Sequence, residues 1–216
     1  MAIQDTLPDP NNRINAAGED TSGSYGPGFS SVQLTSTSPI VTNKSNSGLS
    51  FRTLNSYHQW EIQIKYNDLT KAEFDVVYPY LLERQASLEA FFVELPQYGN
   101  STAGSKNINN TSEAGSNKLF VDSIADINVG DLFHVADVSD DVHVKAYKVT
   151  KITSSPNTLT ISPPLQRKVT YGSQLTQIVV FGTPRIRVVV PDRGINYTIN
   201  SNGLYSFSVK LEESLA

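Results

Sequence analysis

The stretch that decides the fold runs from residue 58 to residue 95 and reads HQWEIQIKYNDLTKAEFDVVYPYLLERQASLEAFFVEL. In its first part, apolar side chains occupy every second position, namely Trp60, Ile62, Ile64 and Tyr66. This alternation is typical of a β-strand that buries one face in a core and exposes the other. We therefore expect a strand here, with the indole of Trp60 packed in the core.

An amphipathic helix is predicted directly after this strand. Thr70 and Glu73 can form a capping box, in which each side chain accepts a hydrogen bond from the other residue's backbone N–H. Apolar side chains then recur at helical spacing, at Phe74, Val77, Tyr78 and Leu81. Pro79 lies inside this run and predicts a kink or an early end of the helix. A second strand is expected over residues 88–95, closed by Pro96, so that one helix is laid across a sheet.

The composition favours a mainly β protein. The 216 residues suffice for one sizeable domain or two small ones, and Ser, Thr, Asn and Gly are abundant, which suits short strands joined by turns. The absence of cysteine excludes disulfides, thiolate metal ligands and a cysteine nucleophile. The net charge of −4 and the pI near 5.4 argue against general nucleic-acid binding, which needs a basic face.

No apolar run approaches the roughly 18 residues that a membrane-spanning helix needs. Residues 1–8 have neither a basic start nor an apolar stretch of the kind found in signal peptides. We therefore expect a soluble, unsecreted protein without a membrane partner.

Residues 1–30 are predicted to form an extended N-terminal arm, because this segment is rich in turn-forming residues and poor in apolar ones. It is either a disordered tail or an arm that becomes ordered on a neighbouring subunit. Two strands follow, over residues 32–38 and 49–54, with the turn between them at residues 43–48. Residues 97–117 hold almost nothing to bury, and we interpret them as a loop that marks a domain boundary.

A second, smaller β unit is expected beyond this loop. Four short strands separated by polar turns predict a small barrel or a curled sheet, over residues 118–124, 130–135, 143–152 and 157–161. A further strand, residues 174–181, could lead back to the first domain.

A strand is expected over residues 185–190. The hairpin of residues 195–199 and 205–211 has the same alternation as the Trp60 strand and is predicted to pair into the same sandwich. The domain prediction is therefore an arm over residues 1–30, a β-sandwich over residues 31–98 plus 181–216, and an inserted small β domain over residues 99–180.

The sequence contains no recognisable catalytic motif: nucleophile elbow, phosphate-binding loop, dinucleotide glycines and zincin helix are all missing. His134 and His143 are the one pair of histidines that could share a metal across a hairpin, and surface or interface roles suit them better. Asp137, Asp140 and Asp141 are better explained as an acidic turn than as a calcium loop. We therefore predict no catalytic, cofactor-binding or metal-binding residue, and no cofactor.

Several of these segments resemble one family. Arg52, His58-Gln-Trp60, the helix start at Leu69–Glu73 and the strand Phe91–Pro96 are similar to the distal tail and baseplate proteins of tailed bacteriophages. Segments of the middle unit, Gly130–Phe133, Ala146–Thr150 and Leu159–Leu165, are similar to the small β domain that such proteins often carry.

The resemblance implies a mainly β fold: a tail-tube-like β-sandwich with one flanking α-helix and an inserted small β-barrel-like domain. It implies a structural virion protein of the phage tail, assembled in the host cytoplasm. Such a protein forms a homo-oligomeric ring, commonly hexameric, that links the tail tube to the hub or to other baseplate proteins, and DNA is only passing cargo. The resemblance carries no catalytic residue with it.

Three other functions stay open on the sequence alone. The small β domain could be a carbohydrate-binding module that contacts the host surface through Tyr98 or Tyr171, which lie among turn residues. The chain could also be a head-tail joining or tail terminator protein. An enzyme such as a depolymerase or muramidase is the third, although no reacting group stands out.

Overall fold

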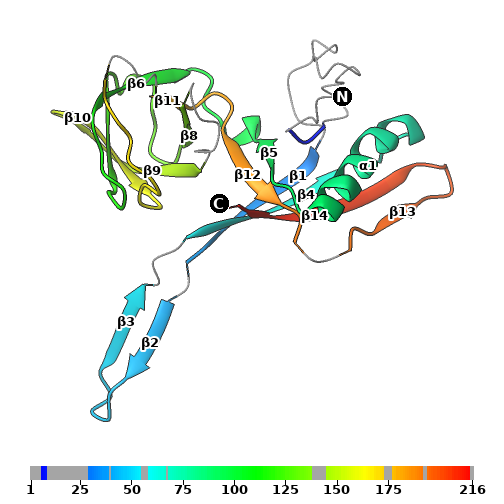
Figure 1. The fold of residues 1–216 in the computed structure, drawn as a ribbon, viewed down its shortest axis with the longest axis horizontal. Helices are drawn as coiled ribbons and strands as arrows, with labels where there is room; N and C mark the ends of the chain where they lie inside the picture. The colour runs from blue at the N-terminus through cyan, green and yellow to red at the C-terminus, as the bar shows by residue number, and fades with distance from the viewer. Residues whose placement is uncertain are drawn as a thin grey trace. The chain divides into compact units, whose positions relative to one another are not determined.

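A computed structural model describes residues 6–8, 29–38, 40–54, 58–66, 68–137, 145–172, 177–191 and 194–214 (Figure 1). Within these residues the fold is mainly β with one α-helix, which confirms the predicted class. In chain order the elements are β1 (Phe29–Thr37), β2 (Ile40–Lys44), β3 (Ser50–Leu54), β4 (Gln59–Tyr66), α1 (Lys71–Ser87), β5 (Phe91–Glu94), the 3-10 helix η1 (Pro96–Tyr98), β6 (Ser105–Asn110), β7 (Lys118–Val121), β8 (Leu132–Asp137), β9 (Ala146–Ser154), β10 (Asn157–Ser162), β11 (Gln177–Val180), β12 (Arg185–Val189), β13 (Tyr197–Ile199) and β14 (Tyr205–Glu213).

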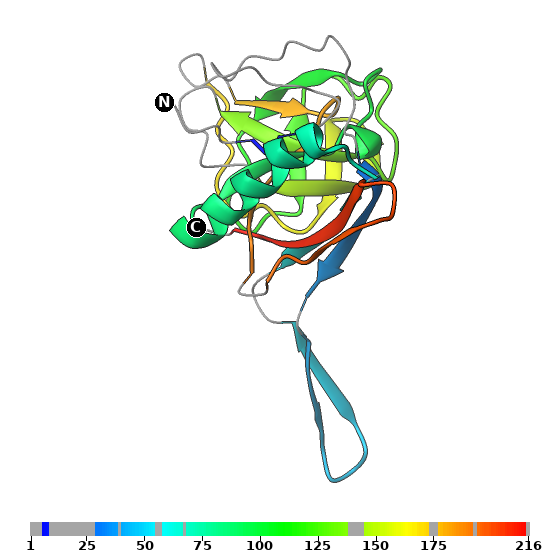
Figure 2. The same ribbon diagram turned by 90° about the vertical axis from the view of Figure 1, so that its right-hand side faces the viewer.

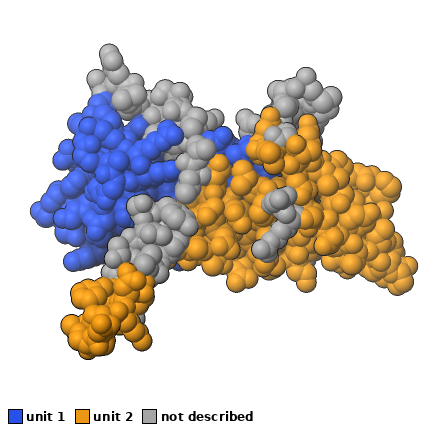
Figure 3. Space-filling model, turned by 60° about the horizontal axis from the view of Figure 1, so that its bottom comes forward, with its two compact units in different colours: residues 1–28, 90–188, 216 blue, residues 29–89, 189–215 orange. Residues whose placement is uncertain are grey.

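The chain divides into two compact units, which Figure 3 draws in different colours. Unit 1 comprises residues 1–28, 90–188 and 216, and unit 2 comprises residues 29–89 and 189–215.

In unit 2 the antiparallel strands β1, β4 and β14 pair in that order, and β13 pairs with β14. Ile64 of β4 lies opposite Val32 of β1 and Val209 of β14, so the apolar side chains of three strands share one face. The predicted phase of the Trp60 strand is confirmed, because Trp60, Ile62, Ile64 and Tyr66 are all buried while the residues between them are exposed. A buried hydrogen bond also joins β4 to β14: the backbone N–H of Trp60 donates to Glu213 Oε2 over 3.1 Å.

The helix α1 begins at the predicted capping box. Thr70 N–H donates to Glu73 Oε2 over 2.8 Å, and Glu73 N–H donates to Thr70 Oγ1 over 3.4 Å. The predicted inner face is confirmed for Phe74, Val77 and Leu81, which are buried. Phe74 stacks on Tyr205 of β14, with 4.4 Å between ring centroids, and Figures 1 and 2 show α1 lying along β13 and β14.

The predicted early end of the helix at Pro79 is wrong, because α1 continues to Ser87. Pro79 is exposed, whereas Val77 and Leu81 on either side of it are fully buried. The burial of these two side chains offsets the one backbone hydrogen bond that proline removes. The helix ends at Leu88, whose left-handed backbone (φ 56°) turns the chain into β5.

A strand that the sequence analysis missed lies before β3. The predicted turn at residues 43–48 is largely confirmed, since Gly48 N–H donates to the carbonyl of Ser45, but the strand before it is not β1. Ile40–Lys44 forms β2, which pairs with β3 from Ile40↔Leu54 to Lys44↔Ser50. β1 pairs with β4 instead. Among the described strands, β2 and β3 pair only with each other, and Figure 1 shows this two-stranded ribbon apart from the other strands of its unit.

Most of unit 1 is a closed barrel of six strands in the order β10-β7-β6-β11-β8-β9. This result sharpens the prediction of a small barrel or curled sheet. Residues 97–117 are not a structureless loop, because they contain most of η1 and all of β6. β6 was missed because it has a single apolar side chain, Ile108, which is buried in the barrel core together with residues such as Phe133, Leu159 and Phe181. β11 pairs with β6 and β8 and completes the closure.

Unit 1 also contains the antiparallel pair β5–β12, which lies where the chain leaves for the barrel and returns from it. Arg185 lies opposite Glu94, and Leu95 N–H donates to the carbonyl of Pro184 over 2.8 Å. Farther along the chain toward the barrel, Asn100 N–H donates to the carbonyl of Phe181, also over 2.8 Å. The outgoing and returning segments therefore lie side by side.

Candidate functional site

His134 on β8 is the one buried histidine among the described residues, and its surroundings make it structural. Its Nδ1 accepts a hydrogen bond from the backbone N–H of Arg185 over 3.2 Å. Burial lowers the pKa of His134 to about 4, and the nearby charge of Arg185 acts in the same direction. His134 is therefore neutral at physiological pH and holds the start of β12 against the barrel.

No metal-binding group is found among the described residues. Within the described ranges, no three side chains of His, Cys, Asp or Glu come together as metal ligands. His143, Asp140 and Asp141 lie outside the described residues, so the suggested histidine pair and acidic turn stay predictions. The third histidine, His58, shares a hydrogen bond of 2.8 Å with Ser36 Oγ and packs edge-on against Trp60.

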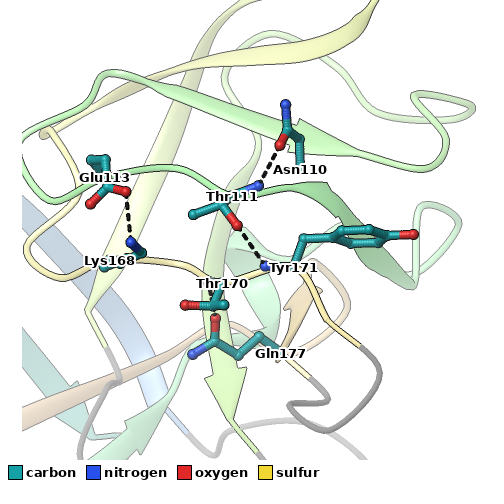
Figure 4. Close-up of polar contacts among 7 residues, drawn as sticks. All are labelled: Asn110, Thr111, Glu113, Lys168, Thr170, Tyr171 and Gln177. Atoms are coloured by element: carbon teal, nitrogen blue, oxygen red, sulfur yellow. Dashed lines mark hydrogen bonds and ion pairs between the residues drawn. The ribbon is translucent and has the colours of Figure 1, made fainter.

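The two aromatic residues singled out for sugar binding have different surroundings. Tyr98 is half-buried in η1, whereas the side chain of Tyr171 is 59% exposed. Figure 4 shows the ring of Tyr171 pointing away from its polar neighbours. Its backbone N–H donates to Thr111 Oγ1 over 3.1 Å, and Thr170 N–H donates to Gln177 Oε1 over 2.7 Å. The barrel thus holds the backbone at Tyr171 and leaves the ring free to stack.

The β2–β3 ribbon carries two strongly exposed apolar side chains of unit 2, in which Leu88 at the end of α1 is also exposed. Leu49 is 63% exposed and Phe51 is 59% exposed, and both lie in or next to β3. A two-stranded ribbon by itself is marginally stable in water. Large apolar side chains on such a ribbon are typical of a surface that another polypeptide covers. The sequence analysis predicted the strand over residues 49–54 and did not indicate that its apolar side chains Leu49 and Phe51 are exposed.

The outer face of the unit 2 sheet is mostly polar and slightly hollowed. A groove of ≈ 440 Å³ lies over β1, β4, β13 and β14. Most of its lining side chains carry hydroxyl or amide groups, among them Ser31, Gln33, Gln63, Asn196 and Ser208, and Lys65 is the one cation in the lining. Cross-strand pairing puts Ser31 and Ser208 on either side of Lys65. Tyr197 and Phe207 also line this groove, so both polar and apolar side chains face it.

The comparisons with known proteins point to a structural protein. Residues 4–98 match the family described as distal tail protein pb9, A domain, N-terminal. The distal tail protein pb9 of Escherichia phage T5 is 29% identical to this chain over 201 residues, which cover 88% of this chain and 94% of pb9. Both matches are to a structural protein of a bacteriophage tail.

Both matches are to distal tail proteins, which supports a structural role in the distal part of a phage tail and a location in the tail of the virion. A distal tail protein associates with other components of the tail. The family match covers the arm, the sheet strands β1 to β4, the helix and β5, whereas the match to pb9 extends over most of the chain. In the part of the chain that the structure describes, no helix is both long and apolar enough to cross a membrane.

Proposed function

We propose that this chain is a distal tail protein and forms a closed ring of identical copies, six-fold in symmetry, that links the tail tube to the hub or to neighbouring tail proteins. The observation that carries this proposal is the β2–β3 ribbon with Leu49 and Phe51 exposed. In a closed ring, the same ribbon on every copy meets the same surface of the next copy, so each exposed apolar patch is covered. DNA passes through as cargo, and a chain of net charge −4 does not hold it.

The ring is tested with a pair of matched variants. Leu49→Ser with Phe51→Ser removes the exposed apolar side chains of the ribbon, and Val129→Ser removes one that is equally exposed, at 62%, in unit 1. Light scattering and electron images are expected to show rings for the wild type and for Val129→Ser, and smaller species for the double variant at unchanged melting temperature. A wild-type protein that stays monomeric and binds neither tube nor hub proteins overturns the proposal.

The inserted position of the barrel is part of the same proposal. We place the sandwich over residues 31–98 plus 181–216 and the inserted domain over residues 99–180. The hydrogen bond from Asn100 N–H to the Phe181 carbonyl supports these limits, because the two ends of an inserted domain lie close together. The insertion then projects from the ring and can vary without disturbing it.

The exposed ring of Tyr171 favours a second candidate function, the binding of a host glycan by the barrel. Aromatic rings stack on the apolar faces of sugars, and Thr111, Thr170 and Gln177 fix the backbone beside this ring. A glycan array distinguishes the candidates: a saturable signal that Tyr171→Ala abolishes supports glycan binding, and no signal restricts the barrel to contacts with virion proteins.

The role is structural, without a catalytic step. Support comes from the kind of protein that matches and from the neutral, hydrogen-bonded state of His134. Clearing of cell-wall or polysaccharide plates by the purified protein would contradict this part of the proposal.

A further inference from the structure

The edge of β5 has an unusual partner in unit 1. On one side β5 pairs with β12 over four residue pairs, from Arg185↔Glu94 to Val188↔Phe91. On its other side a short segment of the N-terminal arm lies parallel to it, with Thr6 opposite Phe92. Leu7 N–H donates to the carbonyl of Phe92 over 2.8 Å. The arm therefore adds to β5 in the way that a bound peptide extends a sheet.

The side chains show that this addition is specific. Leu7 is only 4% exposed, and Pro8 after it is also buried. Phe91, Phe92 and Val93 are all buried, so the edge to which the arm binds is part of a core and not a solvated margin. Leu7 acts as an apolar anchor, and Pro8 ends the added strand because it has no N–H to donate.

The covalent link between the arm and the sheet of unit 2 is long. Residues 9–28 separate Pro8 from Phe29, and they are rich in glycine, proline and asparagine. Twenty residues can span up to about 70 Å when fully extended. A connection of this length allows the segment Thr6–Pro8 to reach the β5 edge of its own chain or that of a neighbouring copy with identical contacts.

We propose that in the assembled ring the segment Thr6–Pro8 of each copy occupies the β5 edge of the next copy. The exchange replaces a contact within one chain by the same contact between two chains, so it costs little free energy. In a closed ring every arm then crosses one interface. The occupant is thus a second copy of this chain, and Leu7 is the residue that anchors it. This inference rests on the proposed ring.

The experiment identifies which chain supplies the arm. Equal amounts of ¹⁴N-labelled and ¹⁵N-labelled protein, both with Thr6 replaced by the photo-reactive residue benzoylphenylalanine, are mixed before assembly and irradiated. Trypsin cuts after Arg13, Arg84 and Lys106, so a cross-link to β5 joins the peptide 1–13 to the peptide 85–106. Cross-linked peptides that carry one label of each kind, in the proportion expected for random partners, support the exchange.

The other outcomes overturn the proposed exchange of arms, and they distinguish its failure from a failure of the proposed ring. Same-label cross-links alone, in samples whose electron images show rings, mean that each arm serves its own chain while the ring stands. Same-label cross-links with no rings mean that both proposals fail. The absence of any cross-link to peptide 85–106 means that the arm does not occupy β5. Leu7→Asp in the same background is the control, and it is expected to abolish the cross-link because it places a charge at the buried anchor.

Discussion

The backbone of Gly99 lies directly against that of Gly182: a Cβ atom on Gly99 would stand 2.0 Å from the carbonyl oxygen of Gly182. The two glycines lie where the chain leaves β5 for the barrel and where it returns toward β12. Only a residue without a side chain permits this approach at position 99, so the junction is defined by backbone contact.

Gly99→Ala is therefore expected to destabilise the protein by about 1–3 kcal/mol, the usual cost of forcing an added methyl group into a packed site. Urea unfolding measures the change. Gly172→Ala is the matched control, because a Cβ there meets nothing within 4 Å. Equal stabilities of the two variants would show that the junction adapts to the methyl group.

His134 is expected to make stability fall as the solution is acidified. Its pKa is about 4 in the folded protein against 6.5 in an unfolded chain, so the unfolded state takes up the proton first. The contribution is fully present above pH 6.5 and is lost as the pH falls toward 4, by roughly 3 kcal/mol over those 2.5 pH units. His134→Gln removes the titrating group and is expected to flatten the pH profile of urea unfolding between these values. Parallel profiles for variant and wild type would contradict this assignment.

Trp60→Asp is expected to unfold unit 2, at a cost of about 4 kcal/mol or more, because an unpaired charge replaces a large buried ring. Thermal melting followed by circular dichroism measures the effect. Gln63→Asp is the control on the exposed face of the same strand and is expected to melt like the wild type. Normal melting of Trp60→Asp would contradict the burial of this ring.

Removal of residues 100–178, with a short linker across the gap, is expected to leave a folded remainder. The ends to be joined lie close together, since Asn100 N–H donates to the Phe181 carbonyl. Cooperative thermal unfolding of the shortened chain checks this expectation. A remainder without a cooperative transition would show that the barrel is an integral part of the fold.

The elements that were predicted correctly are those whose pattern is local. The alternation of β4 and β14 and the capping box of α1 each lie within a few residues of sequence, and each is observed. The early end at Pro79 failed because the tertiary burial of Val77 and Leu81 outweighs a local breaker.

The features that were missed depend on contacts between distant residues. β6 contains one buried apolar side chain, Ile108, and owes its strand structure to its neighbours β7 and β11. The exposure of Leu49 and Phe51 could not be predicted, because an alternating pattern shows that one face is apolar and does not show what covers it. The buried His134 could have been suspected from its position between Phe133 and Val135, both apolar and both in β8.

The closure of the barrel in unit 1 restricts how evolution can change its contacts. Every strand in it already has two neighbours, so no foreign strand can be appended to it. A molecule that binds the barrel must therefore contact its side chains and connecting turns. The exposed positions among them, unlike the buried Ile127, Leu165 and Val169 of the connections, can change without breaking the strand pairing, so the barrel surface can vary while the barrel itself is kept.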